Sequence, residues 1–168
     1  VTGTYAVTAT AGGNITDSGV LAITAAATFT AAGGQSIHLD SANTFSSTIA
    51  FTSGGTLTNV TISDSNDFDF AALTLSGNLN ATSTGGSVTD SGALAITGVT
   101  TVDASSGNVT LDTATNNFQG AVEIDGVNVL VVDGGAIDLG ASTVRGTYAV
   151  TATTGNISDS GNLAVTGT

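Results

Sequence analysis

The stretch GTYAVTATAGGNITDSG at residues 3–19 decides the fold, because it returns one residue shorter at residues 146–161 as GTYAVTATTGNISDSG. Its second half also occurs in mid-chain, where residues 87–97 read SVTDSGALAIT. The Asp of each Asp-Ser-Gly places the copies 73 and then 69 residues apart, at Asp17, Asp90 and Asp159. The sequence is therefore that of a repeat protein. We expect one repeat segment, residues 1–168, with long repeats at approximately residues 3–76, 77–145 and, in part, 146–168.

A shorter period runs inside the long repeat. An Asp that follows an aliphatic-rich stretch and precedes Ser, Thr or Gly recurs at gaps of 21 to 26 residues. The series consists of Asp17, Asp40, Asp64, Asp90, Asp112, Asp133 and Asp159. An Asn-x-Phe marker accompanies some of its members, at residues 43–45, 66–68 and 116–118. This spacing predicts about seven coils of roughly 24 residues, three to a long repeat.

The composition favours strands over helices. The chain has no Lys or Met and a single Glu, whereas Thr, Val, Ile, Gly, Ser and Asn dominate. Short alternating runs such as residues 5–10 and 108–112 end at turn-forming residues, as strands do. A unit of this size cannot enclose a core and has to stack on its neighbours. We therefore predict an all-β, right-handed parallel β-helix, that is, a solenoid. A β-sandwich would not need this period, and propeller blades run to about 40–50 residues.

Inward positions of such a solenoid stack in columns, which can be read from the repeat. The three copies of the motif supply Ile15, Leu21 and Ile23, then Val88, Leu94 and Ile96, and then Ile157, Leu163 and Val165. We expect Phe45, Phe68 and Phe118 to stack in the core as well.

The charge balance excludes several classes of function. Lys+Arg is 1 against Asp+Glu 13, which gives a net charge of -12. A chain with one cation has no basic surface for nucleic acid or for anionic lipid. No apolar run approaches the ~20 residues of a membrane helix, so we expect no membrane insertion. The absence of Cys excludes disulfides and thiolate metal sites.

Three phrases of the sequence resemble the repeats of giant bacterial β-helical adhesins. They are residues 66–68 (NDF), 135–144 (GAIDLGASTV) and 155–166 (GNISDSGNLAVT). The family consists of filamentous-haemagglutinin-like exoproteins and related β-strand-repeat surface proteins, and the resemblance covers the whole chain. It implies a β-helical stalk that is secreted to the cell surface of a diderm bacterium.

The Asp series is the first candidate site. If all seven side chains shared one corner, neighbouring carboxylates would lie about 5 Å apart and would repel each other. Ca²⁺ could then bridge adjacent coils. Alternatively, each Asp closes a turn by accepting backbone N–H groups. A second candidate Ca²⁺ site is the densest acidic cluster, which lacks the central Gly and terminal Glu of an EF-hand loop and consists of Asp64, Asn66, Asp67 and Asp69.

Catalysis is not expected. His38 is the only His, and alternation places it on the surface. A lyase would need more cations than Arg145, and a glycosidase needs paired carboxylates in a groove. Ice-binding β-helices carry ranks of Thr-x-Thr, and four such pairs occur here: Thr8/Thr10, Thr56/Thr58, Thr82/Thr84 and Thr151/Thr153.

The sequence as a whole predicts an extracellular structural or adhesive rod without chemistry of its own. The alternative is a surface-binding module that recognises a glycan, a partner cell or ice through a regular Thr/Asn/Asp face. Neither end carries the polar cap of a free-standing solenoid. We therefore expect self-association, with flanking repeats or copies stacked head to tail, and host-cell, glycan or matrix surfaces as further partners.

Overall fold

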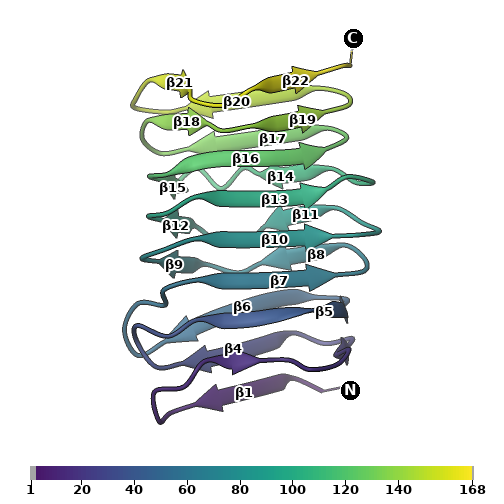
Figure 1. Ribbon diagram of the computed structural model, residues 1–168, viewed down its shortest axis with the longest axis vertical. Helices are drawn as coiled ribbons and strands as arrows, with labels where there is room; N and C mark the ends of the chain where they lie inside the picture. The colour runs from purple at the N-terminus through teal and green to yellow at the C-terminus, as the bar shows by residue number, and fades with distance from the viewer. Residues whose placement is uncertain (1–2, 168) are drawn as a thin grey trace.

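The computed structural model describes residues 3–167 and forms an all-β solenoid without a helix in that range. Figure 1 shows the turns stacked along the long axis, with the N-terminus at one end and the C-terminus at the other. Strands pair in parallel with the turns below and above them. The predicted all-β solenoid is therefore confirmed.

Two sheets form the opposite sides of the solenoid. The first wall is an eight-stranded sheet. In order along the axis it consists of β1 (Tyr5–Ala9), β4 (Ala27–Ala31), β6 (Thr48–Ser53), β8 (Phe68–Phe70), β11 (Val88–Asp90), β14 (Val109–Leu111), β17 (Val129–Asp133) and β20 (Tyr148–Ala152).

The second wall is an eleven-stranded sheet that lies in front in Figure 1. Its main path is β2 (Ile15–Thr16), β5 (Ile37–Phe45), β7 (Val60–Asp64), β10 (Leu79–Ser83), β13 (Thr100–Ala104), β16 (Ala121–Gly126), β18 (Ile137–Leu139) and β21 (Ile157–Asp159). Three further strands pair beside that path: β3 (Ala22–Ile23), β19 (Ser142–Val144) and β22 (Leu163–Val165).

A third, three-stranded sheet lies behind the second wall in the middle of the molecule (Figure 1). It consists of β9 (Leu73–Leu75), β12 (Leu94–Ile96) and β15 (Asn117–Phe118). Its strands follow the shortened strands β8, β11 and β14 of the first wall. Where one wall has a long strand, the other is thus bent into two short ones. The bend is at Asp-Ser-Gly between β2 and β3, between β11 and β12, and between β21 and β22.

The turns are shorter than predicted. Register partners on the first wall are 22 residues apart at Tyr5 and Ala27 and 19 apart at Val129 and Tyr148. The structure has about eight turns of roughly 21 residues, so the prediction of about seven coils of roughly 24 is wrong. The Asp series misled because it changes walls between Asp64 and Asp90, and again between Asp133 and Asp159. Each change spans one turn plus the short connection to the other wall.

The long repeat is not a whole number of turns. Seven steps along the second wall separate β2 from β21, which carry the first and third copies of the motif. The middle copy lies on β11 of the first wall. One long repeat therefore spans about three and a half turns rather than three coils, and successive copies alternate between the walls.

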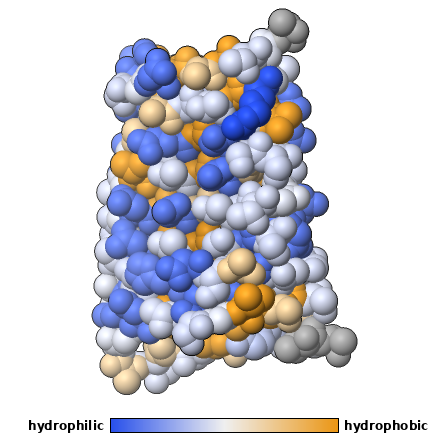
Figure 2. Space-filling view, turned by 45° about the vertical axis from the view of Figure 1, so that its right-hand side comes forward, coloured by the Kyte–Doolittle hydropathy of each residue, from blue (hydrophilic) through white to orange (hydrophobic). Residues whose placement is uncertain are grey.

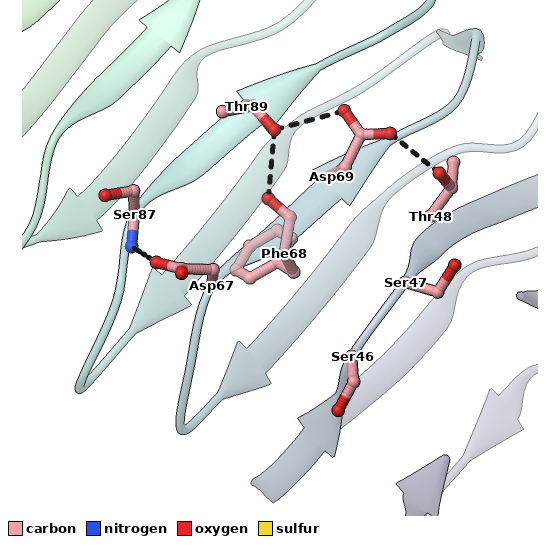
Figure 3. A pocket seen from close by; sticks show the side chains of 8 residues that line it. All are labelled: Ser46, Ser47, Thr48, Asp67, Phe68, Asp69, Ser87 and Thr89. Atoms are coloured by element: carbon pink, nitrogen blue, oxygen red, sulfur yellow. Dashed lines mark hydrogen bonds between the residues drawn. The ribbon is translucent and has the colours of Figure 1, made fainter. Parts of the chain in front are cut away.

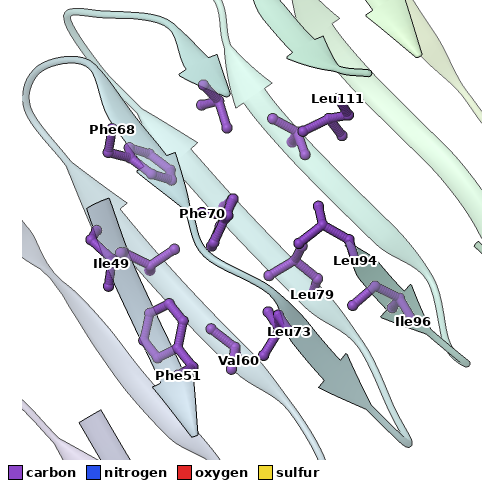
Figure 4. Close-up of a cluster of buried hydrophobic side chains, with 14 of the residues drawn as sticks. Ile49, Phe51, Val60, Phe68, Phe70, Leu73, Leu79, Leu94, Ile96 and Leu111 are labelled. Atoms are coloured by element: carbon purple, nitrogen blue, oxygen red, sulfur yellow. The ribbon is translucent and has the colours of Figure 1, made fainter. Parts of the chain in front are cut away.

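The side chains between the walls form one continuous apolar core (Figure 4). Val88, Leu94 and Ile96 are fully buried, as predicted for the middle motif copy. In the first copy Ile15 and Ile23 are buried and Leu21 is half-buried, whereas in the third copy Leu163 is half-buried and Ile157 and Val165 are exposed. Phe45, Phe68 and Phe118 are buried as predicted. They do not stack on one another. Phe45 contacts Phe29 edge to face, and the other aromatic contacts join Tyr5, Phe29, Phe51, Phe70 and Phe68 in sequence, with ring centroids 5.1–6.2 Å apart.

Candidate functional site

The seven Asp of the predicted column do not form a single column. Asp17, Asp40, Asp64 and Asp159 lie in or directly after strands of the second wall, and Asp90, Asp112 and Asp133 in or directly after strands of the first. Their side chains also differ in exposure. Asp64, Asp90 and Asp133 are buried and Asp17 is half-buried, whereas Asp40, Asp112 and Asp159 are exposed.

The buried members belong to two hydrogen-bonded ladders, each of which crosses three turns. Asp17 lies at the bend between β2 and β3, and one turn above it the Asn43 amide donates from Nδ2 to Asp17 Oδ2 at 2.7 Å. The same amide accepts the Leu21 N–H on Oδ1 at 2.8 Å. One turn higher, Asp64 accepts the N–H of Phe45 at 2.9 Å. We call Asp17, Asn43 and Asp64 the lower ladder.

The upper ladder repeats this arrangement on the opposite side of the molecule, with Asp90, Asn116 and Asp133. Asn116 donates to Asp90 Oδ2 at 2.8 Å and accepts the Leu94 N–H at 2.8 Å. Asp133 accepts the N–H of Phe118 at 2.6 Å. Two copies of the sequence motif thus build the same structure on different walls.

The ladders satisfy backbone groups that the bends would otherwise leave unpaired. An Asp-Ser-Gly bend interrupts the strand, so the N–H groups beside it lose their ladder partners and need side-chain acceptors. Besides the cross-turn bonds, Asp64 Oδ1 accepts the Asn66 N–H and Asp133 Oδ1 accepts the Gly135 N–H. Burial raises the pKa of the Asp64 carboxyl, while the N–H donors of Phe45 and Asn66 act in the opposite direction. The side chains of the two ladders therefore close the bends by pairing backbone N–H groups.

The acidic cluster proposed for Ca²⁺ is not gathered around one point. Asp64 faces the interior, whereas the exposed Asp67 accepts the Ser87 N–H at 2.6 Å. Asp69 accepts hydrogen bonds from the hydroxyl groups of Thr48 and Ser91. The Asn66 side chain donates a hydrogen bond to the carbonyl oxygen of Phe45. Among residues 3–167, no group of three or more His, Cys, Asp and Glu side chains is placed to hold a metal ion.

A shallow groove of about 420 Å³ crosses the first wall beside this cluster (Figure 3). It is lined by Ser46, Ser47, Thr48, Asp67, Phe68, Asp69, Ser87 and Thr89. The phenyl ring of Phe68 is turned into the core and is only 3% exposed, so it offers no platform for a sugar ring. The carboxylates already accept hydrogen bonds from their neighbours. The groove therefore presents hydroxyl groups and carboxylates without a cation.

The other candidates from the sequence are spread over the surface. His38 is half-buried on the second wall between Thr16 and Thr61. The four Thr-x-Thr pairs do not form one rank, because Thr8 and Thr151 lie on the first wall and Thr82 on the second, while Thr56 and Thr58 precede β7. Arg145 forms an ion pair with Asp125, and this bond raises the pKa of the guanidinium.

Two site residues were not predicted, Asn43 and Asn116. Both appeared in the sequence only as part of the Asn-x-Phe marker. The signal that could have identified them is their distance from the Asp of each motif copy, which is 26 residues in both ladders.

The fold and its ladders define a β-solenoid repeat protein. The family model described as "Repeats of unknown function (DUF5649)" matches residues 1–52, 57–125 and 126–168, and the chain belongs to this family. No curated protein and no solved structure matches the chain. Within residues 3–167 there is no helix long and apolar enough to cross a membrane.

Proposed function

We propose that the chain is a rigid segment of an extracellular structural or adhesive rod, without catalytic activity. The observation that carries the proposal is the uninterrupted stack of turns around one core, closed at its bends by the ladders. Without these bonds a bent wall would contain unpaired backbone groups and would deform more easily. The ladders therefore make the solenoid stiff as well as stable.

The lateral surface supports a structural role over a specialised binding face. The face seen in Figure 2 carries mostly hydrophilic residues and residues of intermediate hydropathy, with apolar residues in smaller patches between them. The distribution of the Thr-x-Thr pairs over both walls does not give the regular rank that an ice-binding or lattice-matching face requires. A net charge of -12 also opposes side-by-side association of copies.

The resemblance to filamentous-haemagglutinin-like exoproteins supports the finer part of the proposal, namely secretion to the bacterial cell surface and adhesion to host-cell, glycan or matrix surfaces. The proteins that the chain resembles are typically poor in Cys, and this chain has none. On this proposal the segment sets the length of a stalk. Eight turns at ~4.8 Å each contribute roughly 40 Å.

The test uses cells that produce the parent protein. Antibodies against residues 1–168 should label intact cells, and an in-frame deletion of this segment should shorten a surface projection seen by electron microscopy by roughly 40 Å. Label that appears only after the cells are permeabilised would contradict the extracellular role. A projection of unchanged length would contradict the role of the segment as a spacer.

A further inference from the structure

The outward side chains of the first wall carry almost no charge. The inward positions of its strands fill the core, and the outward positions of β1, β4, β6, β11, β14, β17 and β20 are occupied by Thr, Ala, Leu or Val alone. Asp69 on β8 is the one outward charged side chain among the strands of this wall. Asp67 and Asp112 lie just outside it, directly before β8 and directly after β14.

The second wall is acidic on its outer surface. Asp103 and Asp125 are register partners on β13 and β16, and Glu123 lies two residues before Asp125 on the same side of the sheet. Arg145, the only Lys or Arg of the chain, pairs with Asp125 on this wall. The outward carboxylates of the second-wall strands are Asp40, Asp103, Glu123, Asp125 and Asp138. The rod therefore has one acidic side and one nearly uncharged side.

Several polar side chains of the first wall bind one another across neighbouring strands. The hydroxyls of Thr30 and Thr52 are 2.6 Å apart and share a hydrogen bond. The Asp69 carboxylate accepts hydrogen bonds from Thr48 at 2.9 Å and from Thr89 at 3.1 Å. A polar group that already has a partner costs less to remove from water. Another surface can therefore cover this wall at a lower cost than its Thr content suggests.

The first wall is also large enough for a specific contact. At ~3.3 Å per residue and ~4.8 Å per strand, its eight strands cover roughly 550 Å². Two such walls in contact cover roughly 1,100 Å² in total, which is at the lower end of the range for specific interfaces.

We infer that the first wall is a lateral interface through which two copies of the chain pair face to face. Packed sheets lie about 10 Å apart, so the acidic walls of such a pair, one on each outer side, are roughly 30 Å apart. This is several times the Debye length of about 8 Å at physiological ionic strength. The net charge of -12 therefore opposes this arrangement less than any other lateral contact. The inference goes beyond the proposed function and requires neither its localisation nor its adhesive role.

A second copy fits this wall better than other partners do. The described strands of the wall present no outward aromatic ring on which a sugar could stack, and no cation that could bind a carboxylate or a phosphate group. An identical wall is nearly uncharged as well. The same patch on both copies makes a closed, two-fold contact.

The experiment measures the mass and the shape of the 168-residue chain in solution. We expect sedimentation equilibrium to show a monomer–dimer equilibrium at protein concentrations below about 1 mM, because the interface is small for its class. Small-angle X-ray scattering separates two arrangements: a face-to-face pair keeps the roughly 40 Å length of one copy, whereas an end-to-end pair is roughly 80 Å long. Raising NaCl from about 50 mM to about 500 mM should tighten the pair, since salt screens the repulsion between like-charged copies.

Two matched substitutions show which wall forms the contact. Thr28 and Thr61 are each the second residue of a five-residue strand with the same burial pattern, β4 on the first wall and β7 on the second. The register partners of Thr28 are Ala6 and Ala50. Thr28→Asp places two like charges in the interface and should raise the dissociation constant of the pair by at least about 30-fold. Thr61→Asp adds the same charge to the other wall and should change the constant by less than about threefold. Thermal melts of both variants establish that they fold, and Leu130→Asp on β17 repeats the test on the first wall if Thr28→Asp does not.

Three results would overturn the inference. The first is a chain that stays monomeric up to about 1 mM, because an interface of this size would then not form. The second is a pair that the substitutions on the two walls weaken equally, which would show that the first wall is not the contact. The third is a pair of roughly 80 Å length, or one that salt weakens, which would indicate contacts through the ends or between opposite charges. None of these results depends on where the protein is located, so they are separate from the cell-surface test.

Discussion

Replacing Asn116 by Ala should be among the most damaging single changes in the molecule. Asn116 is fully buried, and its amide makes two bonds of 2.8 Å, to the Asp90 carboxylate and from the Leu94 N–H. Truncation leaves the Leu94 N–H unpaired in the core, which costs about 1–3 kcal/mol. It also removes a hydrogen bond to a charged group, worth about 1.5–3 kcal/mol. We expect a loss of about 3–5 kcal/mol in the free energy of unfolding.

Asn117 supplies a matched control in the neighbouring position. It has the same side chain and is the first residue of β15, directly after Asn116, but its side chain is exposed. Asn117→Ala should change the free energy of unfolding by no more than about 0.5 kcal/mol. Urea denaturation of both variants measures the difference, and amide exchange at Leu94 shows whether the lost stability is at the bend. Equal effects of the two substitutions, or a loss below about 1 kcal/mol for Asn116→Ala, would refute the assigned role of the ladder.

Three further predictions address the core, the buried carboxyl and the cations. Ile96→Asp buries an unpaired charge and should lower the free energy of unfolding by about 4 kcal/mol or more, whereas Thr97→Ser at the exposed neighbour should leave it nearly unchanged. Thermal melts followed by circular dichroism measure both variants, and an equal fall in melting temperature would mean that the inward register is wrong. Because burial raises the pKa of Asp64 above 3.8, the folded state binds more protons than the unfolded state at mildly acidic pH. Stability should therefore rise as the pH falls from 7 toward 4, and Asp64→Asn should flatten this slope in urea titrations; an unchanged slope would remove Asp64 as its cause. Since the oxygens of Asp17, Asp64, Asp90 and Asp133 already accept N–H groups, millimolar Ca²⁺ should raise the melting temperature no more than NaCl of equal ionic strength, and a Ca²⁺-specific rise would restore bridging between turns.

The fold class and the inward register could be predicted from the sequence because both depend on local patterns. Alternation in residues 87–97 identifies Val88, Leu94 and Ile96 as inward, and all three are buried. The internal repeat predicts that successive units stack on one another, since one unit is too small to hold a core of its own. These inferences need no knowledge of which residues face each other across the solenoid.

The period and the Asp column could not be predicted in the same way, because both depend on the wall to which each Asp belongs. Asp64 and Asp90 have similar sequence contexts but lie on opposite walls. A gap of 26 residues between two markers can mean a long coil or one turn plus a change of wall. The sequence spacing does not distinguish them. The same ambiguity hid Asn43 and Asn116, whose partners are 26 residues away and one turn below.

The alternation of the long repeat between the walls is the central structural claim, and spin-label distances test it directly. The residues before the Asp of the three motif copies are Thr16, Thr89 and Ser158, on β2, β11 and β21, with side chains that face outward. Pairwise Cys substitution and pulsed dipolar spectroscopy should place Thr16 and Ser158 about 34 Å apart, which is seven spacings of ~4.8 Å. Thr89 should be equally far from both, and its two distances should add up to clearly more than the third, because it lies on the other wall. Three collinear labels, with Thr16 and Ser158 about 29 Å apart, would instead show whole-number repeats of about 24 residues and contradict the account.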